Sequence, residues 1–238
     1  MIATLLISTY NEGFLIERAF ESIQNQQDKL DFEIIIVDDS STDPTTLKIL
    51  NTLSKFIKVH YTTKNLGLSV SRNLGFQKAS GKFIIPLDGD DYLPENSVQA
   101  ILSCFSENPK IDFVFGNYLK KDIFLNEESI VDCSEIATDG YLDATKLAKK
   151  WILLGTSPCK KSLWEKVGGY DINFSYTLQD VDFWMQSVNL DCIGKHLPEM
   201  IYVWERKPTG LNSNFPWSVY DDLKIKNESF YKKFNCTL

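Results

Sequence analysis

The sequence contains few of the residues that build disulfide frameworks or thiolate and imidazole metal sites. Its 238 residues include five cysteines and two histidines. The cysteines are odd in number, widely spread and form no C-x-x-C pair, which predicts free thiols in a reduced compartment rather than disulfides or a zinc site. The two histidines, His60 and His196, have no second candidate ligand nearby in the sequence, so we interpret both as structural.

The sequence also lacks an excess of positive charge and any long apolar run. Its formal net charge is −7, which argues against a nucleic-acid partner because phosphate binding needs a basic surface. No apolar run approaches the ~18 residues that a membrane-crossing helix requires. The opening MIATLLISTYNEG has no basic region or cleavage signature, so we expect a first strand rather than a signal peptide.

The hydrophobic content of 43% and the charged content of 24% are ordinary for a globular domain. Apolar patterning predicts strands at residues 2–8, 32–37, 56–61, 82–87 and 111–119, and helices at residues 14–26, 43–54, 68–79, 94–106, 143–154, 160–167 and 177–188. The β-α alternation of the first ninety residues predicts a parallel sheet with helices on its faces. Residues 120–142 are polar and show no pattern. An apolar stripe at helical spacing near the C-terminus predicts a docked helix, with a dimer or membrane contact as alternatives.

Polar residues follow three of these strands where each one ends: Thr9 to Glu12, Asp38 with Asp39, and Asp88 to Asp91. Ligands bind at the carboxyl ends of parallel strands, so we expect these clusters to line one crevice. The run FIIPLDGDDYLPE brings three carboxylates together, and like charges this close require a positive partner. Paired carboxylates suit Mg²⁺ or Mn²⁺, and a nucleotide diphosphate is the substrate that such a cation would accompany.

The amino-acid sequence of these segments excludes three other kinds of ligand site, namely an EF-hand, a dinucleotide-binding loop and a P-loop. A calcium EF-hand that began at Asp88 would need glycine and glutamate where Leu93 and Gln99 stand. A dinucleotide fold would need G-x-G-x-x-G after the first strand, which reads STYNEG, and no P-loop pattern occurs. A structural role, in which the carboxylates cap a helix at Pro94, accounts for one aspartate but not for three.

Four segments occur in an order and spacing that chance explains poorly. They are LLISTYNEGFLIERAFESIQNQ, FEIIIVDDSSTD, NLGLSVSRNLGFQKASGKFIIPLDGDDYLPE and VGGYDINFSYTLQDVDFWMQ. Together they resemble the family-2 inverting glycosyltransferases of the GT-A fold, and the resemblance covers nearly the whole chain. It implies an α/β fold with a Rossmann-like, mixed but mostly parallel sheet flanked by helices. Residues 1–214 would form the GT-A domain, with a nucleotide-sugar-binding part at about 1–119 and an acceptor-binding part at about 120–214, and residues 215–238 a C-terminal helix.

The resemblance also implies a role for each matching residue. Asp180 would be the general base that deprotonates the acceptor hydroxyl, so that in-line attack inverts the anomeric carbon. Asp88 and Asp90 would serve the metal, with Asp90 as the better candidate for direct ligation. Arg72, one of only three arginines, would face the nucleotide or its phosphates. The residues implied in nucleotide-sugar binding are Thr9, Tyr10, Glu12, Asp39, Arg72, Asp88 and Gly89, and those that match less specifically are Asp91, Gln179, Arg206 and Lys207.

Several positions have a structural interpretation or depart from the family pattern. Asp38 and Asp39 fit turn chemistry, and Asp91 is placed to cap the next helix. Asp182 lies two residues after the base and faces elsewhere on a helix, so we interpret it as structural or as a support behind the site residues. Gln179 replaces the glutamate that commonly precedes the base. Lys207 stands where histidine is common, and a solvent-facing loop is an equal interpretation of the segment around it.

We therefore predict a metal-dependent glycosyltransferase that moves a sugar from a nucleotide donor, UDP-linked by family habit, to a glycan, lipid-linked or protein acceptor in cell-surface glycan assembly. The expected location is the cytoplasm, and the lysine pairs and the aromatic tail are compatible with peripheral contact at the inner membrane face. The tail is also compatible with a homodimer. A sugar nucleotidyltransferase or phosphotransferase is an alternative, but STYNEG lacks a glycine-rich basic loop. A non-catalytic nucleotide-sugar-binding module is a second alternative, which replacement of Asp180 would distinguish.

Overall fold

The computed structural model describes residues 2–26, 30–207 and 218–236. The strands are β1 Ala3–Thr9, β2 Phe32–Asp38, β3 Lys58–Tyr61, β4 Phe83–Asp88, β5 Phe113–Asp122, β6 Glu127–Val131, β7 Ala137–Thr138, β8 Tyr141–Leu142, β9 Cys159–Lys160 and β10 Gly194–Arg206. The helices are α1 Leu15–Gln24, α2 Pro44–Leu53, α3 Leu68–Lys78, α4 Ser97–Glu107, α5 Ala144–Lys149, α6 Lys161–Val167, α7 Gln179–Asn189, α8 Ser218–Lys226 and α9 Glu228–Phe234, and the 3-10 helices are η1 Cys133–Ile136 and η2 Ile172–Phe174.

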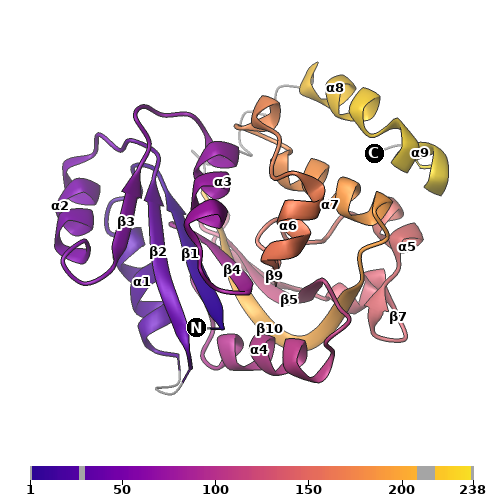
Figure 1. Cartoon of the computed structure of the whole chain (residues 1–238), viewed down its shortest axis with the longest axis horizontal. Helices are drawn as coiled ribbons and strands as arrows, with labels where there is room; N and C mark the ends of the chain where they lie inside the picture. The colour runs from indigo at the N-terminus through magenta and orange to yellow at the C-terminus, as the bar shows by residue number, and fades with distance from the viewer. Residues whose placement is uncertain (1, 27–29, 208–217, 237–238) are drawn as a thin grey trace.

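These strands form one mixed sheet in the order β3-β2-β1-β4-β9-β5-β10-β8-β7, and β6 pairs with β5. Figure 1 shows β3, β2, β1 and β4 side by side in this sheet. Strands β1 to β4 run parallel, as the β-α alternation predicts. Strands β5 and β10 form a second parallel pair, which the short antiparallel β9 joins to β4. Helices α1 and α3 pack on β1, and α4 packs on β5 and β10. The predicted α/β fold with a mostly parallel sheet is confirmed.

Local signals in the sequence explain the first half of this sheet. Every residue of β1 is buried, because helices cover the strand. Helix α3 approaches β1 closely at Gly75, where an added Cβ would lie 2.3 Å from a methyl group of Leu6. Helix α2 begins as expected, since the Asp43 carboxylate accepts a hydrogen bond from the backbone N–H of Thr46 at 2.7 Å and Pro44 follows it.

The second half departs from the prediction in three places. Strand β10, 13 residues long, was not predicted; Pro198 and register shifts on either side of Met200 interrupt its alternation. Helix α5 ends at Lys149 instead of residue 154, and the residues after it form irregular structure. Residues 120–142, expected to be patternless, contain β6, β7, β8 and η1. The first difference reflects pairing with a distant strand, β5, whereas β6 and β7 pair with strands next to them in the sequence.

The expected single helix within residues 215–238 is divided into α8 and α9 at Asn227, and residues 215–217, 237 and 238 lie outside the described residues. Its apolar stripe faces the protein: Leu223 and Phe230 are fully buried, and Phe230 packs edge-on against Trp151 with ring centroids 6.3 Å apart. The tail is therefore docked on the protein, as the helical spacing predicts, and the dimer and membrane contacts stay predictions. Among the described helices, none has the length and apolar character needed to span a membrane.

Candidate active site

A cavity of about 930 Å³ opens at the carboxyl ends of β1 and β4, between the first turns of α3 and α7. The end of β10 and residues 151–156 complete its walls. All of the predicted site residues line it; they are Thr9, Tyr10, Glu12, Asp39, Arg72, Asp88, Gly89, Asp90, Asp91, Gln179, Asp180, Arg206 and Lys207. The three strand-end clusters therefore converge on one crevice.

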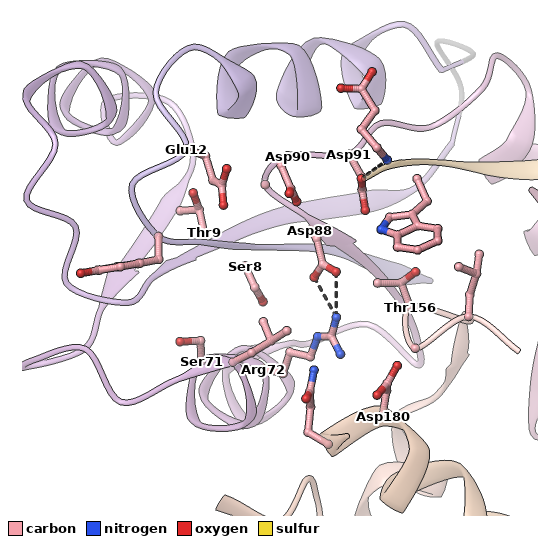
Figure 2. A pocket seen from close by; sticks show the side chains of 18 of the residues that line it. Ser8, Thr9, Glu12, Ser71, Arg72, Asp88, Asp90, Asp91, Thr156 and Asp180 are labelled. Carbon is pink, nitrogen blue, oxygen red and sulfur yellow. Dashed lines mark hydrogen bonds and ion pairs between the residues drawn. The ribbon is translucent and has the colours of Figure 1, made fainter. Parts of the chain in front are cut away.

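The positive partner that Asp88 requires is Arg72. Its Nη2 donates to both carboxylate oxygens of Asp88, at 2.8 and 3.0 Å (Figure 2). The Arg72 side chain is 2% exposed, against 27% for Asp88, and its guanidinium lies 5.6 Å from the centre of the Tyr170 ring. Figure 2 shows this guanidinium between Asp88 and Asp180. Its contact in the structure is thus a carboxylate of the site, and its contact with a nucleotide stays a prediction.

Asp90 is paired with Lys207, whose ammonium group also contacts Glu12. Nζ lies 3.0 Å from Asp90 Oδ2 and 2.5 Å from Glu12 Oε2. Burial raises the pKa of both carboxyl groups, and the neighbouring carboxylates add to this. Burial opposes the charge on Lys207, but Asp90 and Glu12 outweigh it and raise the pKa of the ammonium group. Arg206 lines the cavity as well, although its ion pair is with Asp122 of β5, at 2.9 Å.

Asp91 differs from its two neighbours and does not cap the next helix, which starts only at Ser97. One oxygen of Asp91 accepts from the Tyr202 hydroxyl and the other from the backbone N–H of Glu205, both at 2.8 Å. The Tyr202 hydroxyl in turn accepts from the backbone N–H of Asp88 at 3.2 Å. Burial, together with the neighbouring carboxylates, raises the pKa of Asp91 well above its ordinary value. Asp91 therefore ties the carboxylate loop to β10.

Arg18 of α1 contacts the same loop. Its Nη1 donates to Glu205 Oε1 at 2.8 Å, and its Nη2 donates to the backbone carbonyl of Asp90. Its guanidinium also lies 4.7 Å from the centre of the Tyr92 ring. The loop that carries the carboxylates is thus held by helix α1 as well as by β10.

Local hydrogen bonds occupy the aspartate pair that follows β2. Asp38 accepts from the backbone and the hydroxyl of Ser41, as turn chemistry predicts. Asp39 accepts from the Thr62 hydroxyl at 2.8 Å and from two backbone N–H groups in the turn before α3, and it is 4% exposed. Asp39 therefore builds the turn that leads into α3, and its contact with a base stays a prediction.

The end of β1 leaves an open surface beside these carboxylates. Thr9 is buried, and Gly89 packs so closely on it that an added Cβ would lie 2.8 Å from the Thr9 hydroxyl oxygen. Tyr10 is 41% exposed in the cavity wall. The absence of a side chain at Gly89 and the exposed ring of Tyr10 provide room and a flat apolar surface for a ligand.

Asp180 lies in the first turn of α7, across the cavity from the strand ends (Figure 2). One of its oxygens accepts from the backbone N–H of Val181 at 2.9 Å. Burial raises the pKa of Asp180, and the positive charge of Arg72 partly offsets this. Gly155 packs against it so tightly that an added Cβ would lie 2.4 Å from Oδ2. Beside it, Gln179 is buried, and within the described residues its Oε1 has no hydrogen-bond partner.

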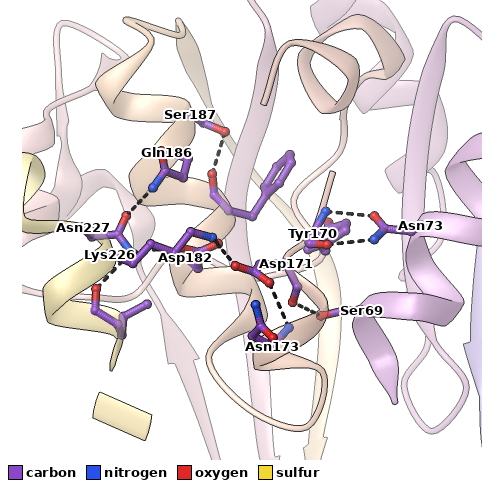
Figure 3. A network of polar contacts seen from close by, with 12 residues as sticks. Ser69, Asn73, Tyr170, Asp171, Asn173, Asp182, Gln186, Ser187, Lys226 and Asn227 are labelled. Atoms are coloured by element: carbon purple, nitrogen blue, oxygen red, sulfur yellow. Dashed lines mark hydrogen bonds and ion pairs between the residues drawn. The ribbon is translucent and has the colours of Figure 1, made fainter. Parts of the chain in front are cut away.

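Sequence reasoning did not single out two parts of this site, namely Tyr202 and the wall at residues 151–156, which includes Gly155. No charge or glycine pattern marks them, and the apolar run in the wall was interpreted as the end of a helix. The interpretation of Asp182 was correct: it is 2% exposed and bonded to Lys226 and Asn227 behind α7 (Figure 3).

The carboxylates can be tested for their fit to a metal ion. Within the described ranges, no group of three or more histidine, cysteine, aspartate or glutamate side chains forms a metal site. Mg²⁺ and Mn²⁺ need fewer protein ligands, because they bind one or two carboxylates together with substrate phosphates. Asp88 and Asp90 supply two, with side chains 27% and 24% exposed. The described lining contains seven acidic and three basic side chains, which favours a cation over a bare diphosphate.

Residues 4–160 match the family model described as Glycosyl transferase family 2. A curated relative from Campylobacter jejuni, GalNAc(5)-diNAcBac-PP-undecaprenol beta-1,3-glucosyltransferase, is 34% identical over 149 residues, which cover 59% of this chain and 47% of that protein. The chain spans about half the length of the curated relatives it matches.

Two solved structures share the fold. Residues 1–349 of S. aureus TarS in complex with UDP-GlcNAc match with a TM-score of 0.77 at 19% identity, over 99% of this chain and 72% of that chain. The mannosyltransferase PcManGT from Pyrobaculum calidifontis, in complex with GDP-Man and Mn²⁺, matches with a TM-score of 0.67 at 19% identity, over 89% of this chain and 59% of that chain. At such identities the likeness shows a common architecture, the GT-A fold.

Proposed function

The chain belongs to glycosyl transferase family 2, and from that membership we propose that it transfers a sugar from a nucleotide-diphosphate donor to a hydroxyl acceptor with inversion. The observation that carries the proposal is the position of Asp180 opposite Asp88 and Asp90 in one cavity (Figure 2). Two carboxylates on the sheet side suit a cation with a diphosphate, and a separate carboxylate on the helix side suits proton transfer. This division fits a group transfer in which one wall binds the donor and the other activates the acceptor.

The donor is proposed to bind along the ends of β1, β2 and β4, and to be UDP-linked. The exposed ring of Tyr10 offers a surface for the base, and Asp39 lies at the same end of the sheet. The volume of about 930 Å³ lies in the upper part of the range of roughly 300–1,000 Å³ that is typical of ligand pockets. That volume leaves room for an acceptor group beside the donor. The UDP-GlcNAc complex of TarS, which shares the fold, supports a uridine nucleotide.

Asp88 and Asp90 would hold a divalent cation, Mn²⁺ or Mg²⁺. Asp90 is the better direct ligand, because both oxygens of Asp88 already accept from Arg72. Such a cation supplies neutralisation of the charge that develops on the leaving diphosphate. Lys207 lies within 3.0 Å of Asp90 and places a further positive charge there. The Mn²⁺ complex of PcManGT supports this choice of metal.

Asp180 would act as the general base. It takes the proton of the acceptor hydroxyl while that oxygen forms its bond to the anomeric carbon. The bond from that carbon to the diphosphate oxygen breaks, and its electron pair leaves with the diphosphate. Attack from the face opposite the leaving group inverts the configuration. Burial raises the pKa of Asp180, which makes its carboxylate a better proton acceptor near neutral pH.

The acceptor is proposed to lie along residues 151–156, which gives an acceptor part at about 120–214 and a donor part at about 1–119. The side chains of Trp151 and Trp204 line the same cavity and suit the apolar faces of a sugar. The name of the C. jejuni relative specifies an undecaprenol-linked acceptor, which supports a lipid-linked glycan and peripheral contact with the inner membrane face. The hairpin between β5 and β6 exposes Ile123, Phe124 and Leu125 by 53%, 74% and 53%, and such a surface suits a lipid interface.

A thermal-shift panel tests the donor and the metal together. UDP-GlcNAc, UDP-glucose, GDP-mannose and dTDP-glucose are added singly, each with Mn²⁺ and with EDTA. We expect one sugar nucleotide to raise the melting temperature, and to do so less in EDTA, because a ligand that binds only the native state stabilises it. If none of them stabilises the chain, the donor assignment is wrong.

The variant Asp180→Asn tests the chemistry. We expect it to retain sugar-nucleotide binding and to lose turnover by about 10²- to 10⁴-fold, the usual contribution of a general base. Turnover equal to that of the wild type would remove Asp180 from the mechanism. Donor binding without release of the nucleoside diphosphate by the wild type would indicate a binding module. Conversion of the sugar nucleotide and added pyrophosphate into a nucleoside triphosphate and a sugar phosphate would indicate a nucleotidyltransferase.

A further inference from the structure

The C-terminal tail forms hydrogen bonds and an ion pair with α7 at the point where α8 meets α9 (Figure 3). Lys226 Nζ lies 2.7 Å from Oδ2 of Asp182 and 2.6 Å from Oδ2 of Asp171. Asn227 Nδ2 donates to the other oxygen of Asp182 at 2.9 Å, and its Oδ1 accepts from Gln186 at 3.0 Å. Two adjacent tail residues therefore hold both oxygens of an aspartate that lies two positions after the proposed base.

The same lysine reaches the segment that packs on α3. The backbone carbonyl of Asp171 accepts from the Ser69 hydroxyl at 2.9 Å. One residue earlier, the backbone exchanges two hydrogen bonds, both of 2.8 Å, with the side chain of Asn73. Ser69 and Asn73 lie on α3, which also carries Arg72. The lysine therefore lies where the helix that bears Arg72 is connected to the helix that bears the proposed base.

Charge and burial make this junction dependent on a cation. Asp182 is 2% exposed, and a carboxylate buried to that extent is costly unless it is paired. Asp171 and Asp182 would repel each other without Lys226, since their carboxylates approach the same ammonium group. Burial opposes the charge on Lys226, but its hydrogen bonds to the two aspartates outweigh this and raise the pKa of the ammonium group.

We propose that Lys226 is a positioning residue for sugar transfer: by joining Asp182 to Asp171 it fixes the first turn of α7 relative to α3, and so holds Asp180 in place. The backbone N–H of Asp182 donates to the carbonyl of Leu178 at 2.9 Å, so a displaced Asp182 moves the turn that carries Asp180. The inference rests on the proposed function, because it takes Asp180 as the base.

The experiment compares Lys226→Met and Lys226→Arg with the matched control Lys224→Met. Lys224 lies on the same helix, and its ammonium group is 5.4 Å from the centre of the Tyr220 ring of that helix. With Mn²⁺ and the sugar nucleotide that gives the largest thermal shift, release of the nucleoside diphosphate by transfer to water yields kcat and KM. Assays are run well below the lowest melting temperature. Hydrogen exchange of residues 177–184 reports on the first turn of α7 independently of activity, with α4 as the internal reference.

We expect Lys226→Met to lower kcat about tenfold, equivalent to about 1.4 kcal/mol, with the donor KM within about twofold of the wild type. Residues 177–184 should exchange faster in this variant alone. Lys226→Arg should restore kcat, because it keeps a cation between the two aspartates, and Lys224→Met should behave as the wild type. If Lys226→Met does not fold, Asn227→Ser, which removes the hydrogen bonds of Asn227 with Asp182 and Gln186, should show the same changes to a smaller extent.

Unchanged kcat and unchanged exchange in Lys226→Met would overturn the inference. A lower melting temperature with unchanged kcat would also overturn it, because that result describes a purely structural contact. The proposed function fails separately: if Asp180→Asn turns over like the wild type, the base is misassigned. If Asp180→Asn is inactive while Lys226→Met is fully active, only the positioning role is refuted.

Discussion

Replacement of Arg72 by methionine removes the cation that holds Asp88 at the end of β4. The two residues are joined by hydrogen bonds of 2.8 and 3.0 Å from a single guanidinium nitrogen. Methionine keeps much of the apolar stem of the arginine and can still pack beside Tyr170. The change therefore leaves the Asp88 carboxylate without its partner, and it also removes the guanidinium from the Tyr170 ring.

The loss in the free energy of unfolding caused by Arg72→Met can be bounded from the burial of the Arg72 and Asp88 side chains. Disruption of a buried ion pair costs about 3–5 kcal/mol, whereas a surface pair contributes about 0–1 kcal/mol. Arg72 is 2% exposed and Asp88 is 27% exposed, so this pair lies between the two classes. We expect Arg72→Met to lower the free energy of unfolding by about 2 kcal/mol. For a chain of 238 residues this corresponds to a fall in the melting temperature of about 4–8 °C.

A double-mutant cycle separates the pair from its surroundings. Arg72→Met, Asp88→Asn and the double variant are compared by urea unfolding followed by tryptophan fluorescence. We expect a coupling free energy of at least about 1 kcal/mol, because the second substitution removes a charge that the first has already left unpaired. The pair Arg206 and Asp122, at a similar distance of 2.9 Å but with Arg206 49% exposed, is the matched control and should couple less. Free energies that add to within about 0.5 kcal/mol for Arg72 and Asp88 would refute the reasoning.

Three further predictions concern acid stability, the position of the base and the pH dependence of turnover. Burial would raise the pKa of Glu33, but hydrogen bonds from Ser80 and Thr4 outweigh it and lower that pKa to about 2. Glu33→Gln should therefore lower the free energy of unfolding at pH 7, measured in urea, by up to about 3 kcal/mol. This difference in stability from the wild type should vanish as the pH falls from 4.5 toward 2, because Glu33 becomes protonated in the native state. A difference that stays constant with pH would contradict the lowered pKa of Glu33. Gly155→Ala should lower kcat about 10- to 100-fold, because the Cβ of the alanine would displace the Asp180 carboxylate. UDP binding, measured by calorimetry, should be unchanged. Full activity would show that the Asp180 carboxylate has room to move. Asp180 accepts a proton only when it is ionised, and burial raises its pKa. The acid limb of the pH profile of kcat should therefore have its midpoint above pH 3.8. A midpoint at or below pH 3.8 would contradict this prediction.

The first half of the fold could be predicted because its signals are local. Strands β1, β2 and β4 are apolar runs largely buried within the sheet, and Asp43 with Pro44 marks the start of α2. Strand β10 could not be predicted from its own residues, because Pro198 and two register shifts interrupt its alternation. Its place beside β5 depends on pairing between residues about eighty positions apart. Strand β9 contains only two residues, too few for any periodicity.

The same distinction applies to the site. Thr9, Asp39 and Asp88 follow strands of a parallel sheet, so the strand-end rule brings them together without knowledge of side-chain packing. Tyr202 and Gly155 reach the cavity from β10 and from the irregular segment after α5, whose positions the sequence does not encode locally. Residues 151–154 form an apolar run that is equally compatible with helix and with a cavity wall. Periodicity alone cannot distinguish these two outcomes.

The three carboxylates of the loop after β4 have separate environments because their partners come from different elements. Asp88 is held by Arg72 of α3, and Asp91 by Tyr202 and the backbone of β10. Separation of either pair would leave a buried polar group, Arg72 or Asp91, without its hydrogen-bond partner. Lys207 differs, since its ammonium is carried on a flexible stem and its side chain is 20% exposed. Of these three carboxylates, Asp90 is therefore the one paired with a flexible side chain, which suits its proposed role of receiving a cation together with an anionic donor.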